Sequence, residues 1–524
     1  MPAPTTINTT AIKEQSRNLC VVFVHGWSVT NTDTYGALPE RLRLEAASAG
    51  LVLQVEDIFL GRYISFHDEV QLSDITHAFD CAIHDQLSAV LADGTRFICI
   101  THSTGGPVVR DWWHRYYQQR ARAGICPMSH LIMLAPANYG SALAQLGKQR
   151  IGRLKAWMGG VEPGQGVLDW LELGSNASWD LNTDWIMSDG SQIAPDGCFP
   201  FVLTGQSIDR AFYDNLNTYT GEIGSDGVVR TAAAHLQGAY LGLVQEPPKP
   251  DPAQPGMYLA ATLEVGKYQQ APQSALLVLA GKSHSGEKMG IMRSVQAASS
   301  DTQSAATVAA ILACLQVQTS AQYANLCAEF AIATEQVQAR KVLETEKHFL
   351  IADTHFFHDK HAMLIFRVRD DQGHAISDFD LLLTAGPEAD PNHLPQGFFV
   401  DRQRNQRNPE VITYYFNRDV MKGCDAIVDD EGNILRAALP GAGMLGFKII
   451  ARPDTGFVHY LPCEIKATKE MLESALRRNS TTLIDIRLRR IVHKEVFRSG
   501  PLLAGGQSVD FANVQPGPEI VDTK

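Results

Sequence analysis

The hydrophobic positions of the first 318 residues form short, nearly uninterrupted apolar runs that alternate with longer segments of helical spacing. Such runs are typical of parallel strands buried on both faces of a sheet, and the intervening segments predict helices covering those faces. The predicted strands are Val21–Val24, Leu51–Glu56, Arg96–Ile100, His130–Leu134, Phe199–Leu203 and Ala275–Leu279, and the predicted helices are Tyr35–Ala49, Leu72–Leu91, Val108–Ala123 and Thr302–Leu315. The alternation indicates an α/β domain over residues 1–318.

Two stretches interrupt this alternation. Residues 140–196 are rich in Trp and Gly and predict an insertion that covers the carboxyl edge of the sheet as a lid. Residues 245–256 contain five prolines, which predict an extended loop.

The pattern changes after about residue 340, where strand-like segments with partial alternation follow one another mostly without crossover helices. These segments are Ala362–Arg369, Phe379–Thr384, Gly397–Asp401, Val411–Phe416, Ile434–Leu439, Gly446–Ala451, Val458–Ile465 and Thr482–Arg489. The pattern predicts an antiparallel β-sandwich-like accessory domain over residues 346–504. Residues 319–345 predict a helical connection, and residues 505–524 a loose tail.

Composition narrows the classes of partner and compartment. The net charge of −12 argues against nucleic acid as a partner, because phosphate binding needs a basic surface. Nine cysteines without CxxC pairs, several in apolar runs, indicate buried thiols in a reduced chain. The N-terminus shows no signal-peptide pattern, and no apolar run is long enough for a transmembrane helix. We therefore expect a chain that is cytoplasmic as synthesised, with any export following a leaderless route.

A strand that runs into a tight turn carries the candidate nucleophile. The segment Phe97–Gly106 reads FICITHSTGG, so that Ser103 stands between an apolar run and a helical pattern. A Ser on such a turn is raised above the sheet, where a general base can reach it, and small residues beside it permit the strained backbone. Thr101 stands where the full motif has Gly. A plain strand-to-helix turn with an incidental Ser is the alternative.

The earlier segment Val21–Trp27, VVFVHGW, lies at the end of a predicted strand. In α/β folds with a serine nucleophile on such a turn, the loop after this strand supplies one backbone N–H that hydrogen-bonds the oxyanion of the intermediate. We assign the two donors to the backbone N–H groups of Trp27 and Thr104. We interpret His25 as a structural histidine that shapes its loop.

A nucleophilic Ser needs a base and an acid that orients it, here in the chain order Ser, acid, His. His284 follows the last predicted strand directly in a loop of small residues, whereas His235 lies in an Ala-rich helical pattern. Asp226, flanked by Gly and Ser and followed by two valines, is the favoured acid, and Asp209 is the second candidate.

These motifs together resemble the lipase branch of the α/β-hydrolases, the group of lecithin–cholesterol acyltransferase, PGAP-like proteins and bacterial lipases. The matching segments are VHGW at 24–27, HSTGG at 102–106, LAPANYGS at 134–141, SDGVV at 225–229 and SHSG at 283–286. The resemblance covers about the first 320 residues and implies an α/β-hydrolase fold with Ser103, Asp226 and His284 as the triad. A weaker resemblance, to phospholipase effectors of type VI secretion, would imply a secretion carrier or an immunity protein as partner.

The predicted activity is therefore hydrolysis of a lipid ester, of the lipase or phospholipase A type, at a lipid or membrane surface and without a cofactor. Two alternatives stay open: an esterase, thioesterase or acyltransferase acting on a small soluble substrate, and a hydrolase-like scaffold that only binds.

Two further clusters of residues are most simply interpreted as structural. The segment His355–His361, HFFHDKH, contains metal-ligand types at a spacing that fits no common site, so we predict a surface turn and no metal. In the C-terminal domain, basic and aromatic residues could dock on a lipid surface or on a partner, although a solvated face above an ordinary core is the simpler interpretation. These residues are Arg402, Arg404, Arg407, Lys422, Phe398, Phe399, Tyr414 and Tyr415.

Overall fold

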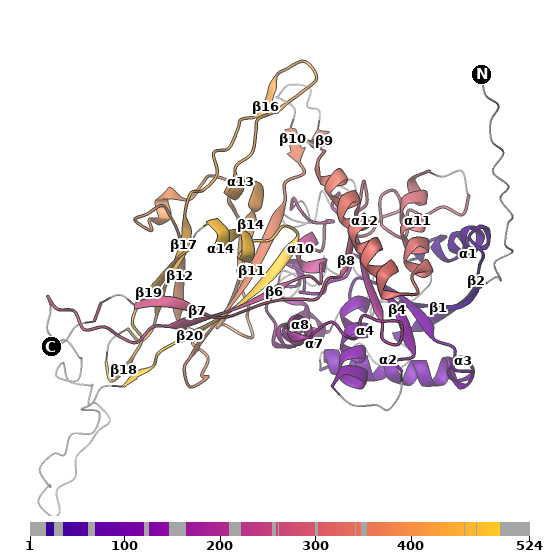
Figure 1. Ribbon diagram of the computed structural model, residues 1–524, viewed down its shortest axis with the longest axis horizontal. Coiled ribbons are helices and arrows are strands. Elements are labelled where there is room, and N and C mark those ends of the chain that lie inside the picture. The colour runs from indigo at the N-terminus through magenta and orange to yellow at the C-terminus, as the bar shows by residue number, and fades with distance from the viewer. Residues whose placement is uncertain are drawn as a thin grey trace, which may run out of the picture.

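The computed structural model describes residues 17–25, 35–60, 69–119, 125–145, 164–208, 222–253, 258–259, 261–298, 302–340, 342–346, 354–454, 456–467 and 469–492. In Figure 1 the first half of the chain forms a layered α/β body, and the second half a large β-rich region beside it.

A six-stranded parallel sheet organises the first half, and its strands coincide with the six predicted ones. They are β1 (Arg17–His25), β2 (Leu51–Phe59), β3 (Phe97–His102), β4 (Met128–Leu134), β5 (Phe199–Gly205) and β8 (Ala275–Leu279). Their order is β2-β1-β3-β4-β5-β8, and every neighbouring pair is parallel. The carboxyl ends of all six strands therefore meet at one edge, where sites form in such sheets.

Helices cover both faces of this sheet. One face carries α1 (Leu38–Ser48), α11 (Thr302–Gln316) and α12 (Ser320–Gln338), and the other carries α2 (Leu72–Gln86), α4 (Gly105–Trp113), α7 (Gln165–Leu171) and α8 (Asn176–Met187). Short helices α3 (Ser88–Ala92) and η3 (His114–Gln118, a π-helix) extend α2 and α4. Side chains of β1 alternate between the two cores, with Val22 and Val24 in one and Val21 and Phe23 in the other. This burial on both faces explains the continuous apolar runs in the sequence.

Helix α12 also closes the β8 edge of the sheet. The hydroxyl of Thr334 accepts from the backbone N–H of Val278 (3.0 Å) and donates to the carbonyl of Leu276 (3.2 Å). An edge strand leaves backbone groups unpaired, and here helix side chains satisfy some of them.

The second half is organised by a nine-stranded sheet in the order β12-β17-β19-β7-β6-β20-β11-β14-β13. Its strands are β6 (Ala239–Gln245), β7 (Ala261–Gln270), β11 (His361–Asp370), β12 (Phe379–Ala385), β13 (Phe399–Arg404), β14 (Val411–Asn417), β17 (Leu445–Ala451), β19 (Cys463–Ala467) and β20 (Ser480–Leu488). The sequence predicted an antiparallel sheet. The pairs β11–β20, β20–β6 and β19–β7 are parallel, so the sheet is mixed.

Strands β6 and β7 were not predicted, and the proline-rich segment 245–256 connects them. They precede residue 318 in the chain yet pair with strands of the C-terminal sheet. The domain division at 318 stays a prediction, and the sheet crosses it.

The nine-stranded sheet bends until its two ends face each other. The Tyr414 hydroxyl on β14 donates to the carbonyl of Leu381 on β12 (2.8 Å), and the rings of Phe366 and Phe447 meet edge to face at 5.2 Å. This gives the sandwich-like core. Helices α13 (Arg418–Lys422) and α14 (Lys469–Ala475) and the two-stranded pairs β9–β10 (Val342–Glu346, Thr354–Phe357), β15–β16 (Ile427–Val428, Ile434–Arg436) and β18–β21 (Val458–His459, Ile491–Val492) complete the region.

Strand β11 joins the two halves of the molecule through its alternating side chains. Met363 and Ile365 pack into the core shared with α4, α7 and α8, whereas Leu364 and Phe366 pack inside the bent sheet. Because one strand contributes to both cores, the β-rich region is part of the support of the α/β body.

All nine cysteines are free thiols, and seven of them are buried. Burial raises the pKa of Cys463 to about 12, so this thiol is inert at neutral pH. Across the part of the chain that the structure describes, no helix is both long and apolar enough to cross a bilayer.

Candidate active site

Ser103 stands on a sharp turn between β3, which ends at His102, and α4, which begins at Gly105. Its φ of +53° is unfavourable for an L-residue and costs about 1–2 kcal/mol. The surrounding backbone holds the turn, since the Ser103 N–H donates to the carbonyl of Leu134 (3.0 Å). This is the raised serine that the sequence predicted.

Two glycines make room for the turn. A Cβ on Gly106 would lie 2.7 Å from the Cβ of Pro136, and one on Gly105 would lie 3.3 Å from the Cβ of Thr101. Thr101 itself is fully buried. The turn therefore accommodates Thr at a position where the motif has Gly, because Gly105 leaves space for its side chain.

His284 lies in the loop after β8 with its ring between the other two predicted residues. Its Nε2 is 3.1 Å from Ser103 Oγ, and its Nδ1 is 2.9 Å from Asp226 Oδ2. The ring is 3% exposed, so bulk water has little access to either hydrogen bond. This geometry is that of a nucleophile, a base and an orienting acid.

The carboxylate of Asp226 is fully buried and held at both oxygens. Oδ2 faces His284, while Oδ1 accepts from the backbone N–H groups of Val228 (3.0 Å) and Val229 (2.8 Å). The His284 N–H donates to the Asp226 carbonyl (2.9 Å), which ties the two loops together. The second candidate acid, Asp209, lies outside the described residues.

His102 is a site residue whose position the sequence did not reveal. Its ring packs on that of His284 at 4.7 Å, and its Nε2 lies 3.1 Å from the His284 carbonyl. Burial, with a smaller contribution from His284, holds the pKa of His102 well below its usual range. The neutral ring can donate Nε2–H to that carbonyl and so fixes the backbone of the candidate base. Its position before Ser103 was the only signal in the sequence.

The predicted oxyanion donors are described only in part. Thr104 is buried immediately before the first residue of α4, where backbone N–H groups are unpaired within the helix. Trp27, the other predicted donor, lies outside the described residues, as does its loop.

A small apolar pocket, with an empty volume of about 270 Å³, opens at Ser103. It is lined by Ser103, Thr104, Ala137, Ser141, Ala144, Leu168, Leu171, Val228 and Val229. The predicted insertion contributes to it through Leu168 and Leu171 of α7. Its tryptophans Trp170, Trp179 and Trp185 do not line the pocket but pack into the hydrophobic core, and Trp157 lies outside the described residues.

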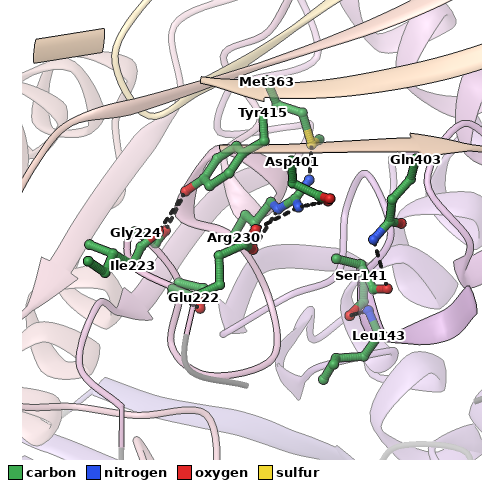
Figure 2. Close-up of polar contacts among 12 residues, drawn as sticks. Ser141, Leu143, Glu222, Ile223, Gly224, Arg230, Met363, Asp401, Gln403 and Tyr415 are labelled. Carbon is green, nitrogen blue, oxygen red and sulfur yellow. Dashed lines mark hydrogen bonds and ion pairs between the residues drawn. The ribbon is translucent and has the colours of Figure 1, made fainter. Parts of the chain in front are cut away.

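Arg230 and Tyr415 connect the C-terminal region to the loop that carries Asp226, and Figure 2 shows their contacts. The Arg230 guanidinium donates to both carboxylate oxygens of Glu222 (2.8 Å each) and forms an ion pair with Asp401 on β13. The Tyr415 ring on β14 lies 4.2 Å from the guanidinium carbon, and its hydroxyl donates to the carbonyl of Gly224 (3.2 Å). These contacts fix both ends of the loop that carries Asp226.

The remaining predicted clusters have structural roles. His361 begins β11 and stacks on Tyr415 at 4.9 Å, and within the described ranges no three His, Cys, Asp or Glu side chains gather as a metal site. In the C-terminal aromatic set, Phe398 and Tyr414 are buried, and only Phe399 is exposed, at 45%. That set is mainly an ordinary core.

Comparison with solved structures decides the family. The structure of phospholipase PlaB from Legionella pneumophila is 41% identical to this chain, covers 94% of it and 98% of its own length, and superposes with a TM-score of 0.79. The chain belongs to the PlaB phospholipase family. The same phospholipase in complex with thio-NAD is 40% identical, with 93% of this chain and 97% of that chain covered and a TM-score of 0.77. No protein-family model and no curated protein matches the chain.

Proposed function

We propose that this protein is a serine carboxylester hydrolase of the phospholipase A type. The observation that carries the proposal is the hydrogen-bonded array of Ser103, His284 and Asp226 on a strained turn at the carboxyl edge of the sheet. Membership in a phospholipase family supports a lipid as the substrate.

In the proposed mechanism, His284 Nε2 takes the proton of Ser103 Oγ as that oxygen attacks the acyl carbonyl. The oxyanion is stabilised by backbone N–H groups, for which Thr104 and Trp27 remain the candidates. The tetrahedral intermediate expels the alcohol, which takes the proton from His284. A water molecule, deprotonated by His284, then attacks the acyl-serine and releases the fatty acid, restoring Ser103.

Asp226 orients His284 and stabilises its transient positive charge. Its Oδ1 is fixed by two backbone amides, so its Oδ2 can point only toward Nδ1 of His284. His102 acts as a positioning residue, because it holds the carbonyl of His284 and packs on its ring.

The test compares wild type and Ser103→Ala on phospholipid vesicles and on a short soluble ester, with the exposed-serine variant Ser88→Ala as matched control. We expect fatty-acid release from vesicles to fall by about 10⁴-fold or more in Ser103→Ala and to be unchanged in Ser88→Ala. Activity on the soluble ester alone would favour the small-substrate esterase, and equal behaviour of Ser103→Ala and wild type would favour the binding scaffold.

We also propose, from the sequence resemblance, that the enzyme acts outside the producing cell as a type VI secretion effector. A competition assay between producing and susceptible bacteria, with and without a functional secretion apparatus, tests this. Killing that does not depend on the apparatus would exclude that route.

A further inference from the structure

Two segments outside the catalytic array form part of the wall of the pocket beside the nucleophile. Helix α7 contributes Leu168 and Leu171, and the loop after β4 contributes Ser141 and Ala144. The two segments touch, because the Ser141 N–H donates to the carbonyl of Leu171 (2.8 Å). A Cβ on Gly140 would lie 2.4 Å from the same carbonyl. These two segments are the α7 wall, and a shift of either one changes the space beside the nucleophile.

The C-terminal sheet contacts the loop half of this wall. Gln403, near the end of β13, donates from Nε2 to the carbonyl of Ala142 (3.2 Å). Figure 2 shows its side chain directed toward the loop that carries Ser141 and Leu143. Gln403 is buried but does not line the pocket, so it reaches the wall through this backbone carbonyl.

The turn between β13 and β14 (residues 405–410) contacts the helical half of the wall, at the end of α7. Glu172 is 1% exposed, and its Oε1 accepts from the backbone N–H of Gln406 (2.9 Å). Asn405 Nδ2 donates to the carbonyl of Leu173 (3.0 Å). Both contacts are made within two residues of the last residue of α7, so the turn holds that end of the helix.

The β13–β14 turn is itself fixed in shape. Asn405 Oδ1 accepts from the backbone N–H groups of Arg407 (3.0 Å) and Asn408 (2.8 Å), so one side chain both shapes the turn and binds the end of α7. The packing nearby is close, since a Cβ on Gly174 would lie 2.3 Å from Cγ1 of Val411 on β14. An interior packed this closely transmits a displacement from one element to the next.

We propose that Gln403 and Asn405 fix the position of the α7 wall and thereby determine how long an acyl chain the pocket accepts. They are positioning residues, since neither lines the pocket. The inference rests on the proposed ester hydrolysis and adds to it a determinant of substrate choice in the C-terminal sheet. The empty volume of the pocket, about 270 Å³, is below the roughly 300–1,000 Å³ typical of small-molecule sites, so the pocket holds only part of a long acyl chain.

Such a pocket leaves a signature in the dependence of kcat/KM on acyl length. Each further methylene that is buried raises kcat/KM by up to roughly fourfold. The rise stops at the length where the chain meets Leu168 and Leu171. This length is the break in the profile, and it reports the position of the wall independently of the overall rate.

The test measures kcat/KM of the full-length protein for two graded series of monomeric esters, p-nitrophenyl esters and phosphatidylcholines, with acyl chains from acetyl to octanoyl. Leu171→Ala enlarges the pocket directly. Gln403→Met keeps the side-chain volume and removes the hydrogen bond to the loop, and the lost Oε1 has no partner among the described residues. Asn405→Asp keeps the acceptor that shapes the turn and removes the donor to the end of α7.

Ser480→Ala is the matched control. It removes a hydrogen bond from β20 to the carbonyl of Gln237 (2.8 Å), a contact of the C-terminal sheet with a residue that does not line the pocket. We expect the break to move to longer chains in Leu171→Ala and in both turn variants. The ratio of kcat/KM for octanoyl to that for butanoyl esters should rise by roughly fourfold or more. Ser480→Ala should keep the wild-type break even where its Tm is lower.

The outcomes separate this inference from the proposed function. Hydrolysis that persists in Ser103→Ala, or wild type inert on both series, would refute the proposed function. When hydrolysis depends on Ser103, a wild-type profile without a break, or an unmoved break in Leu171→Ala, would refute the wall. An unmoved break in Gln403→Met or Asn405→Asp, each verified as folded by circular dichroism, would refute the role of the turn, as would an equal shift in Ser480→Ala.

Discussion

Arg230 links the C-terminal sheet to the candidate acid, and its replacement by Met tests that link. The Arg230 side chain is 2% exposed, and those of its partners Glu222 and Asp401 are 8% and 11% exposed. Met keeps much of the apolar volume but leaves two carboxylates close together in a low dielectric. Breaking a buried ion pair in this way costs about 3–5 kcal/mol.

That cost translates into a modest change in melting temperature because the chain is long. With about 2.1 cal/mol/K of unfolding entropy per residue, a chain of about 500 residues that unfolds together has about 1 kcal/mol/K, so a loss of about 4 kcal/mol lowers Tm by about 4 °C. Activity should fall more visibly, since Asp226 lies four residues away on the same loop. A displacement of about 1 Å there would reduce kcat by about 10²-fold.

The stability that Arg230→Met loses relative to wild type should also depend on pH. Burial is the largest influence on Glu222 and raises its pKa even beside Arg230. Loss of Arg230 raises the pKa of Glu222 further. A carboxyl group with a raised folded-state pKa favours the fold when protonated and opposes it as pH rises through that pKa. Arg230→Met should therefore be closest to wild type at acidic pH and least stable, relative to wild type, at alkaline pH.

The chain offers a matched control in Arg452, which also pairs with two carboxylates, Asp378 and Asp380, but on an exposed surface. Arg452→Met should leave both Tm and kcat close to wild type, because exposed pairs are screened by water and salt. Calorimetric melting at several pH values, with vesicle hydrolysis in parallel, compares the two variants. Equal Tm and kcat for Arg230→Met and Arg452→Met would refute the link.

Three further changes have defined outcomes. Asp226→Asn should preserve Tm within a few degrees while lowering kcat by about 10⁴-fold, because an amide favours the wrong tautomer of His284. A decrease of kcat by less than tenfold in the vesicle assay would point to another acid. Gly106→Ala places a Cβ 2.7 Å from that of Pro136 and should cost about 1–3 kcal/mol in urea unfolding, so an unchanged midpoint would contradict the packing described. Burial lowers the pKa of His130 and of His235 to about 4, below the unfolded value of 6.5. Between these two pH values the unfolded chain binds more protons than the folded one. The free energy of unfolding therefore falls as pH drops through that window, by about 3 kcal/mol for each histidine. A His130→Gln variant should lose less stability than wild type between pH 7 and pH 4.5, and equal losses would count against this assignment.

Local pattern determined much of this protein. The six strands of the parallel sheet were predictable because burial on both faces makes each one a continuous apolar run. Ser103 and His284 were predictable as candidates because each directly follows such a strand. Asp226 was predictable because it lies between them in chain order, in a loop of small residues followed by two valines. The structure brings all three within hydrogen-bonding distance. These inferences needed only neighbours in sequence and the chain order of the motifs.

Only the tertiary structure decided which distant segments meet. Strands β6 and β7 pair with strands more than 190 residues later, and Arg230 reaches Asp401 across 171 positions. The same packing buries the tryptophans of the insertion and places His102 on His284. Local sequence patterns could not predict these contacts individually, because the contacts depend on how the bent sheet and the α/β body pack against each other.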